Sequence, residues 1–123
     1  MKQHSPQFLK LVTDAKSRIK EISQKTLKEK ITNHEPFYLI DVREDSEWTS
    51  GHIPTAIHLG KGIIERDIEK KVQDQEAQIV VYCSGGFRCA LVADSLQKMG
   101  YTEVYSLETG SQGWVDAGYD LSR

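Results

Sequence analysis

Apolar residues follow two different patterns, one in the N-terminal part of the chain and one in the remainder. Residues 5–17 carry apolar side chains at helical spacing behind Ser5-Pro6, a pair typical of a helix start. A short extended segment, 19–22, follows, and Ser23 is able to cap a second helix that ends near Asn33. The pattern therefore predicts two amphipathic helices separated by a short extended piece.

After Pro36 the apolar residues form short continuous runs, which are typical of strands buried on both faces. These runs are 37–42, 56–59, 79–82 and 104–107, and helical patterns lie between them at 44–49, 63–72 and 88–99. Strands that alternate with helices predict an α/β fold with a central, mainly parallel sheet and helices on both faces.

Composition narrows the class of protein. The chain has 123 residues, and its 16 Lys plus Arg against 18 Asp plus Glu give a net charge of −2. A binder of nucleic acid or of anionic membranes needs a basic surplus, so neither partner is expected. No apolar run approaches the ~20 residues of a membrane span. Residues 1–12 place Lys10 inside their apolar patch and offer no cleavage site, so they do not form a secretory signal. We expect a cytoplasmic protein.

The segment 79–90 reads as a strand, a glycine-containing turn and a helix, and Cys83 stands where the strand ends. Gly85 and Gly86 allow backbone N–H groups to converge, and the helix that follows adds its free N-terminal donors. Arg88 adds a positive charge. Such a cradle favours the Cys83 thiolate, which is a nucleophile. The competing interpretation is a small buried residue at a strand end, with Arg88 simply exposed to solvent.

The second cysteine, Cys89, falls in the first turn of the predicted helix. Two cysteines are too few for a disulfide scaffold, and we expect both as thiols in a reducing compartment. The simpler interpretation of Cys89 is a packed small residue. The alternative is a resolving role, in which it forms a disulfide with Cys83 after oxidation.

Three blocks of sequence resemble the rhodanese homology domain between about Ile22 and Tyr119. They are residues 39–56 with Leu-Ile-Asp-Val-Arg-Glu and Gly-His-Ile-Pro, the loop from Cys83 to Arg88, and residues 100–114 with Gly-Tyr, Val-Tyr and Gly-Trp. The resemblance implies a rhodanese-like domain over 19–123, a closing helix after the last strand, and an N-terminal helical extension over 1–18. For that extension we expect packing on the sheet, with dimerisation or partner docking as alternatives.

The length of the cysteine loop points to one branch of this family. Cys83 and Arg88 enclose four residues, as in the family's sulfurtransferases, whereas its phosphatases and arsenate reductases enclose five. The resemblance implies that Cys83 becomes a persulfide, with Ser84, Gly85, Gly86, Phe87 and Arg88 holding the transferred sulfur. Thiosulfate is the expected donor, a thiol or cyanide the acceptor, and a protein acceptor is an alternative. No metal or organic cofactor is implied. A persulfide carrier or binding module with poor small-molecule turnover stays an open alternative.

A few residues outside the loop complete the predicted site. Asp41 resembles the family aspartate that supports the loop. Arg43 and Glu47 are spaced i, i+4, which indicates a structural ion pair. Lys61 and Arg66 flank a strand-to-helix loop at the expected rim, where they either steer an anionic donor or form solvated surface. None of the four histidines stands out as a general acid, and displacement at sulfur does not demand one. Thr55 and residues 108–110 depart from the family's glycine pattern.

Overall fold

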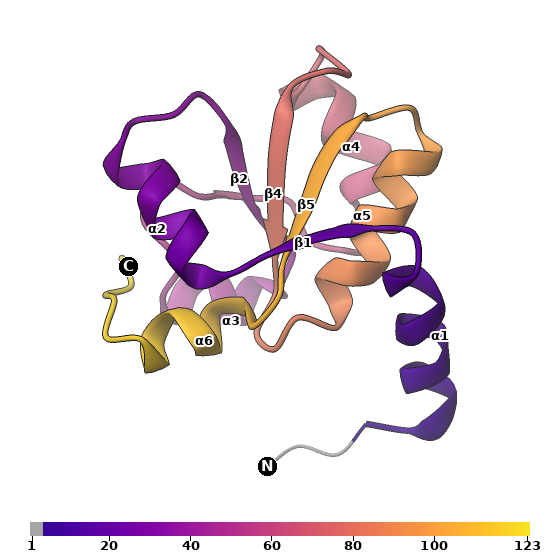
Figure 1. Ribbon diagram of the computed structural model, residues 1–123, viewed down its shortest axis with the longest axis horizontal. Helices are drawn as coiled ribbons and strands as arrows, with labels where there is room; N and C mark the ends of the chain where they lie inside the picture. Colours follow the sequence, from indigo (N-terminus) through magenta and orange to yellow (C-terminus); the bar gives the residue numbers. More distant parts are fainter. Residues whose placement is uncertain (1–3) are drawn as a thin grey trace.

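The computed structural model describes residues 4–123, so residues 1–3 of the predicted N-terminal extension lie outside the described part. The described chain folds into alternating helices and strands (Figure 1). In chain order these are α1 (Pro6–Lys16), β1 (Lys20–Ile22), α2 (Gln24–Thr32), β2 (Tyr38–Asp41), α3 (Asp45–Ser50), β3 (Ile57–His58), α4 (Ile64–Lys71), β4 (Gln78–Tyr82), α5 (Arg88–Lys98), β5 (Glu103–Leu107) and α6 (Gly110–Asp116).

The five strands form one sheet in the order β1-β5-β4-β2-β3, and every neighbouring pair is parallel. The central strands are aligned so that Asp41 lies opposite Tyr82 and Val81 lies opposite Ser106. All strands therefore end at the same edge of the sheet, and the predicted mainly parallel sheet is confirmed. Ligands of open α/β sheets bind beyond this edge.

Two apolar clusters, one on each face of the sheet, show why the strands are hydrophobic throughout. One cluster joins alternate residues of β2, β4 and β5 to α4 and α5, and the other joins the opposite residues to α2 and α6. Figure 1 shows α4 and α5 on one side of the sheet and α2 and α6 on the other. The predicted α/β architecture with helices on both faces is confirmed.

Local capping explains why the starts of α1 and α2 were readable from the sequence. The Ser5 side chain accepts a hydrogen bond from the Phe8 N–H, and the Ser23 side chain accepts one from the Thr26 N–H at 3.1 Å. Each bond satisfies a donor that the first helical turn leaves free. Helix α6, by contrast, was expected only from the family resemblance, and the structure places it directly after β5.

The N-terminal helix packs differently from expectation. Helix α1 contacts α5, the helix that lies between it and the sheet, and it buries Val12 and Ala15. Arg18, just beyond α1, donates to Asp94 of α5 at 2.8 Å and to Asp14 at 2.9 Å. The expected packing of this helix on the sheet itself is therefore wrong, because α5 already covers that face. None of the helices in residues 4–123 is both long and apolar enough to cross a membrane.

Candidate active site

The loop from Cys83 to Arg88 connects the carboxyl end of β4 to the start of α5. At this edge, the lower one in Figure 1, the N-terminal ends of α5 and α6 lie close to α3. The N–H of Ser111 donates to the Cys83 carbonyl at 2.8 Å, and the N–H of Gln112 donates to the Ser84 carbonyl at 3.0 Å. The first turn of α6 therefore holds the base of the loop in place.

Gly86 is required by the close approach of the loop to the chain after β5. Its φ is 93°, in the left-handed region, and a Cβ built there would overlap the carbonyl oxygen of Glu108. In return, the Gly86 N–H lies 3.2 Å from the Cys83 Sγ and donates to it. The predicted role of Gly86 in directing an amide toward the cysteine sulfur thus has a geometric basis.

The Cys83 side chain is buried, with the residue 1% exposed, and hydrogen-bond donors contact its sulfur. Besides the Gly86 amide, the Cys89 Sγ lies 3.5 Å away. A hydrogen bond from the Cys89 thiol is the main reason that the pKa of Cys83 is well below that of an ordinary thiol. Burial opposes this effect, while the Cys89 and Gly86 amides and the Arg88 charge add to it. The lowered pKa of Cys83 agrees with the thiolate that the sequence predicted, but the sequence did not predict the Cys89 thiol as its main donor.

Cys89 is fully buried, as its interpretation as a packed residue predicts, yet its thiol also belongs to the site. The Ser106 hydroxyl of β5 donates to the Cys89 Sγ at 3.1 Å. Its hydrogen bond to Cys83, together with burial, holds the pKa of Cys89 above the usual value, so Cys89 is the protonated member of the pair. The resolving alternative for Cys89 requires a contact with Cys83, but spacing along the sequence does not establish it, because it depends on the loop folding back over the first turn of α5.

Arg88 forms a bidentate ion pair with Glu47, so Glu47 does not pair with Arg43 as the sequence predicted. Its two Nη atoms lie 2.8 and 3.0 Å from the Glu47 carboxylate, which also accepts a hydrogen bond from the Ser84 hydroxyl at 2.9 Å. Hydrogen bonds from Arg88 lower the pKa of Glu47 to about 2. The predicted Arg43–Glu47 pair is wrong: Arg43 precedes the N-cap residue of α3, so the i, i+4 spacing does not place it on that helix.

Arg43 instead pairs with Asp41 in a buried network beside the loop. The Asp41 carboxylate accepts from the Arg43 backbone N–H at 2.8 Å, from its guanidinium at 2.8–3.1 Å and from the Tyr82 hydroxyl at 2.7 Å. Arg43 also donates to the Gly51 carbonyl at 2.6 Å. Since Tyr82 precedes Cys83, Asp41 is linked to the loop through β4, which fits the supporting role that the resemblance implied.

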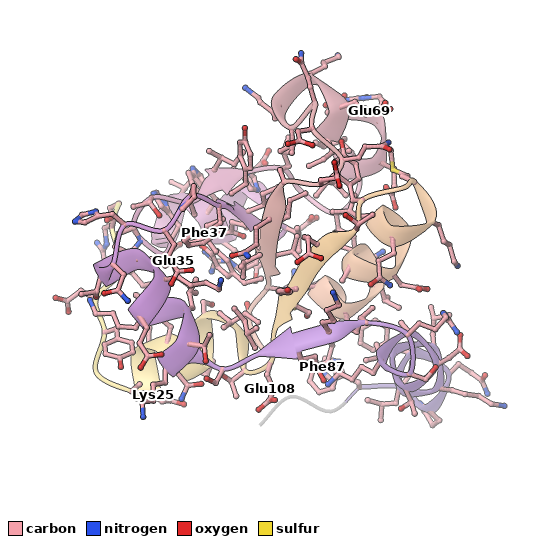
Figure 2. All side chains as sticks on the ribbon, turned by 45° about the horizontal axis from the view of Figure 1, so that its top comes forward. Lys25, Glu35, Phe37, Glu69, Phe87 and Glu108 are labelled. Carbon is pink, nitrogen blue, oxygen red and sulfur yellow. The ribbon has the colours of Figure 1, made fainter. Side chains whose placement is uncertain are left out.

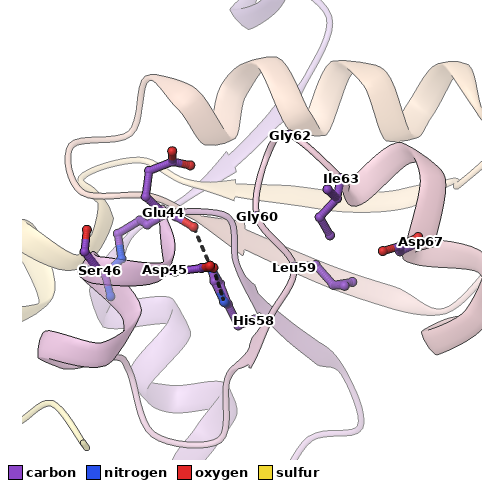
Figure 3. A pocket seen from close by; sticks show the side chains of 10 residues that line it. Glu44, Asp45, Ser46, His58, Leu59, Gly60, Gly62, Ile63 and Asp67 are labelled. Carbon is purple, nitrogen blue, oxygen red and sulfur yellow. Dashed lines mark hydrogen bonds and ion pairs between the residues drawn. The ribbon is translucent and has the colours of Figure 1, made fainter.

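The predicted rim residues lie beside a separate pocket of about 650 Å³ between the ends of β2 and β3 and the start of α4. Figure 3 shows Asp45 and His58 at one side of this pocket and Ile63 and Asp67 at the other. Arg66 is 73% exposed and pairs with Asp67 at 2.8 Å, which favours the interpretation as solvated surface. Within residues 4–123, neither Arg66 nor Lys61 forms an ion pair or side-chain hydrogen bond with the cysteine loop.

The N-terminal segment, residues 4–16, also reaches the loop, and no pattern in the sequence predicts this contact. The ring centroids of His4 and Phe87 are 4.5 Å apart, those of Phe8 and Phe87 are 6.4 Å apart, and the Lys16 Nζ lies 5.5 Å from the Phe87 ring. Figure 2 shows Phe87 close to this helix. Residues outside the predicted domain therefore form one wall beside Phe87.

Taken together, the loop holds a buried cysteine, and amide and thiol donors directed at its sulfur favour the thiolate form. This arrangement suits attack on an electrophilic atom whose leaving group departs as an anion, because the same donors can stabilise negative charge on the group that is added to the sulfur. Among residues 4–123, no three His, Cys, Asp or Glu side chains are grouped so that they could hold a metal ion.

Comparison with known proteins identifies the family. The model of the rhodanese-like domain matches residues 23–117, and the chain belongs to this family. It is 42% identical over 98 residues to "Putative sulfurtransferase YtwF" of Bacillus subtilis, which covers 78% of this chain and 90% of that protein. It is 36% identical over 76 residues to the thiosulfate sulfurtransferase GlpE of Coxiella burnetii, covering 62% and 69% of the two chains.

A solved structure resembles the described fold over almost its whole length. It is a Rhodopseudomonas palustris protein described as a "Possible Tyrosine Phosphatase", with a TM-score of 0.84, 26% identity and 99% of both chains covered. Sulfurtransferases and a possible phosphatase, two of the three activities that the family resemblance raised, therefore occur among the names of similar proteins.

Proposed function

We propose that this chain is a sulfurtransferase that accepts a sulfane sulfur on Cys83 from a small anionic donor such as thiosulfate. The observation that carries the proposal is the Cys83 sulfur at the floor of a four-residue loop, with the Gly86 amide 3.2 Å and the Cys89 thiol 3.5 Å away. Relatives named as sulfurtransferases support the same reaction class.

The first step is displacement at sulfur. The Cys83 thiolate attacks the outer sulfur of thiosulfate, a new S–S bond forms, and the sulfur–sulfur bond of the donor breaks with its electron pair leaving on sulfite. The persulfide then carries its negative charge on the outer sulfur. Backbone amides of the loop, the Gly86 amide among them, stabilise that charge. In the second step cyanide or a thiolate attacks the outer sulfur and the Cys83 thiolate leaves.

Loop size is the reason for preferring sulfur transfer to phosphate transfer. The four residues between Cys83 and Arg88 form a narrow cradle, and Arg88 is already bound to Glu47 and to the Ser84 hydroxyl. A phosphate monoester would need that guanidinium for its own oxygens. A single outer sulfur needs only a few amide donors.

Sulfite release tests the proposal at its first step. Mixing the reduced protein with thiosulfate should release one sulfite per chain, and adding cyanide should turn this into continuous thiocyanate formation. Cys83→Ser, which is nearly isosteric, should do neither, because a hydroxyl is a far weaker nucleophile at neutral pH. Cys89→Ser, matched in chemistry and also buried, should still release sulfite.

Two results would contradict the proposal. One is sulfite release by a folded Cys83→Ser variant at the wild-type rate, with circular dichroism showing that both proteins are folded. The other is a wild type that releases no sulfite but hydrolyses an aryl phosphate through Cys83, which would instead favour the phosphatase interpretation.

A further inference from the structure

Cys89 carries a thiol that the sulfur-transfer steps use only as a hydrogen-bond donor to Cys83. It is 0% exposed, so no external electrophile reaches it, and the sulfur atom that it faces is the Cys83 Sγ at 3.5 Å. A disulfide needs about 2.05 Å between sulfurs, so the two atoms must approach by about 1.5 Å. The pair is placed for an internal reaction.

We propose that Cys89 resolves the Cys83 persulfide, releases hydrosulfide and leaves a Cys83–Cys89 disulfide, so that the protein also acts as a sulfide-releasing persulfide reductase. This inference rests on the proposed function, which supplies the persulfide. The electrophile is the inner sulfur of the persulfide, the Cys83 Sγ, and the outer sulfur is the leaving group.

The reaction balances within the chain. The Cys89 sulfur bonds to the Cys83 Sγ, the bond from the Cys83 Sγ to the outer sulfur breaks, and the electron pair of that bond leaves on the outer sulfur. The Cys89 proton is transferred to the outer sulfur, which departs as hydrosulfide. The sulfane sulfur is thereby reduced to sulfide while the two cysteines are oxidised to a disulfide. An external dithiol is the class of reductant that returns the disulfide to two thiols.

The surroundings of the two sulfurs favour this direction of attack. The Gly86 amide reaches the Cys83 Sγ from the loop, which is where the outer sulfur would be held. Cys89 reaches it from the first turn of α5 and is itself held by the Ser106 hydroxyl of β5 at 3.1 Å. The Gly86 amide and the Cys89 thiol therefore contact the Cys83 Sγ from different structural elements. Displacement at sulfur requires the nucleophile and the leaving group to lie on opposite sides of the attacked atom.

Formation of the persulfide also changes the charge that Cys89 faces. In the resting protein the neighbouring Cys83 thiolate holds the Cys89 thiol in its protonated form. Once the outer sulfur carries the negative charge, the Cys83 Sγ is a neutral, electrophilic atom. The Ser106 hydroxyl then remains as a donor that stabilises negative charge developing on the Cys89 sulfur.

The experiment is a single turnover without reductant. Fully reduced protein, freed of dithiol under anaerobic conditions, is incubated with thiosulfate, and sulfite, sulfide and intact mass are measured. No dithiol is added, because it would attack the persulfide directly. Wild type should release one sulfide for each sulfite and lose the mass of two hydrogen atoms. Cys89→Ser should release sulfite but no sulfide and should gain the mass of one sulfur atom.

Each outcome of this single turnover either supports or overturns the resolving role of Cys89. Wild type that keeps the added sulfur atom and releases no sulfide overturns the inference while the sulfite leaves the proposed function standing. Absence of sulfite from both proteins overturns both. If Cys89→Ser does not fold, peptide mapping of thiosulfate-treated wild type still decides: a Cys83–Cys89 linkage absent from untreated protein supports the inference, and free cysteines overturn it.

Discussion

The hydrogen bond from Cys89 to Cys83 leads to a prediction about the acidity of the Cys83 thiol. A hydrogen bond to a charged group contributes about 1.5–3 kcal/mol, and a thiol is a weak donor, so the lower end of that range applies. At about 1.4 kcal/mol per pKa unit, Cys89→Ala should raise the pKa of Cys83 by about 1 unit. Cys89→Ser keeps a donor at the same position and should raise it by less.

The assay is the ultraviolet absorbance of the thiolate, followed from acid to about pH 9, which does not require a reagent to reach the buried sulfur. Cys89 stays protonated over this range because its pKa is raised, so the wild-type step belongs to Cys83. Cys83→Ser is the control and should show no step. The same midpoint in Cys89→Ala as in wild type would refute the assignment of Cys89 as the main donor.

Three further predictions concern the Glu47–Arg88 ion pair, the backbone at Thr55 and the close approach of the loop at Gly86. Glu47→Gln should lower the free energy of unfolding by about 1–2 kcal/mol at pH 7 in urea titrations, allowing for the 31% exposure of both partners. The pKa of Glu47 falls from 4.5 to about 2 on folding. The difference in unfolding free energy between wild type and Glu47→Gln should therefore be complete above about pH 4.5 and vanish as the pH falls toward 2. A difference independent of pH would contradict the ion pair with Arg88. Thr55→Gly should raise the free energy of unfolding by about 1 kcal/mol, because Thr55 is held at a φ of 76°. A lower free energy of unfolding in this variant would contradict backbone strain at Thr55. Gly86→Ala should reduce sulfur transfer by about a hundredfold, because it displaces the loop. Gly85→Ala is the control and should reduce it far less, because a Cβ there would meet only the Phe87 ring at 3.6 Å. Equal losses in the two variants would show that the φ of Gly86 does not control sulfur transfer.

The order of helices and strands was readable from the sequence because it depends on neighbours along the chain. Continuous apolar runs predict strands covered on both faces, and Ser5 and Ser23 cap their helices through residues three positions away. The cysteine loop was readable for the same reason, since Cys83, the glycines and the start of α5 are consecutive.

The charge pairs of the site depend on tertiary structure instead. Glu47 and Arg88 are 41 residues apart and meet because α3 and α5 both begin at the carboxyl edge of the sheet. Arg43 turns back to Asp41 because it stands before α3, where helical spacing does not apply. The i, i+4 rule holds for two residues on one helix. It does not apply to Arg43 and Glu47, because Arg43 lies outside α3.

By itself, the sequence determined the α/β architecture, the position of Cys83 at the end of a strand and the size of the loop around it, because local patterning and chain connectivity fix these features. Only the tertiary structure brought the Cys89 thiol to the Cys83 sulfur, placed the Ser106 hydroxyl behind it and set the N-terminal helix against Phe87. Such contacts arise from packing between elements distant in the chain, and their distances, not their spacing in sequence, set the pKa and the reactivity of the sulfur.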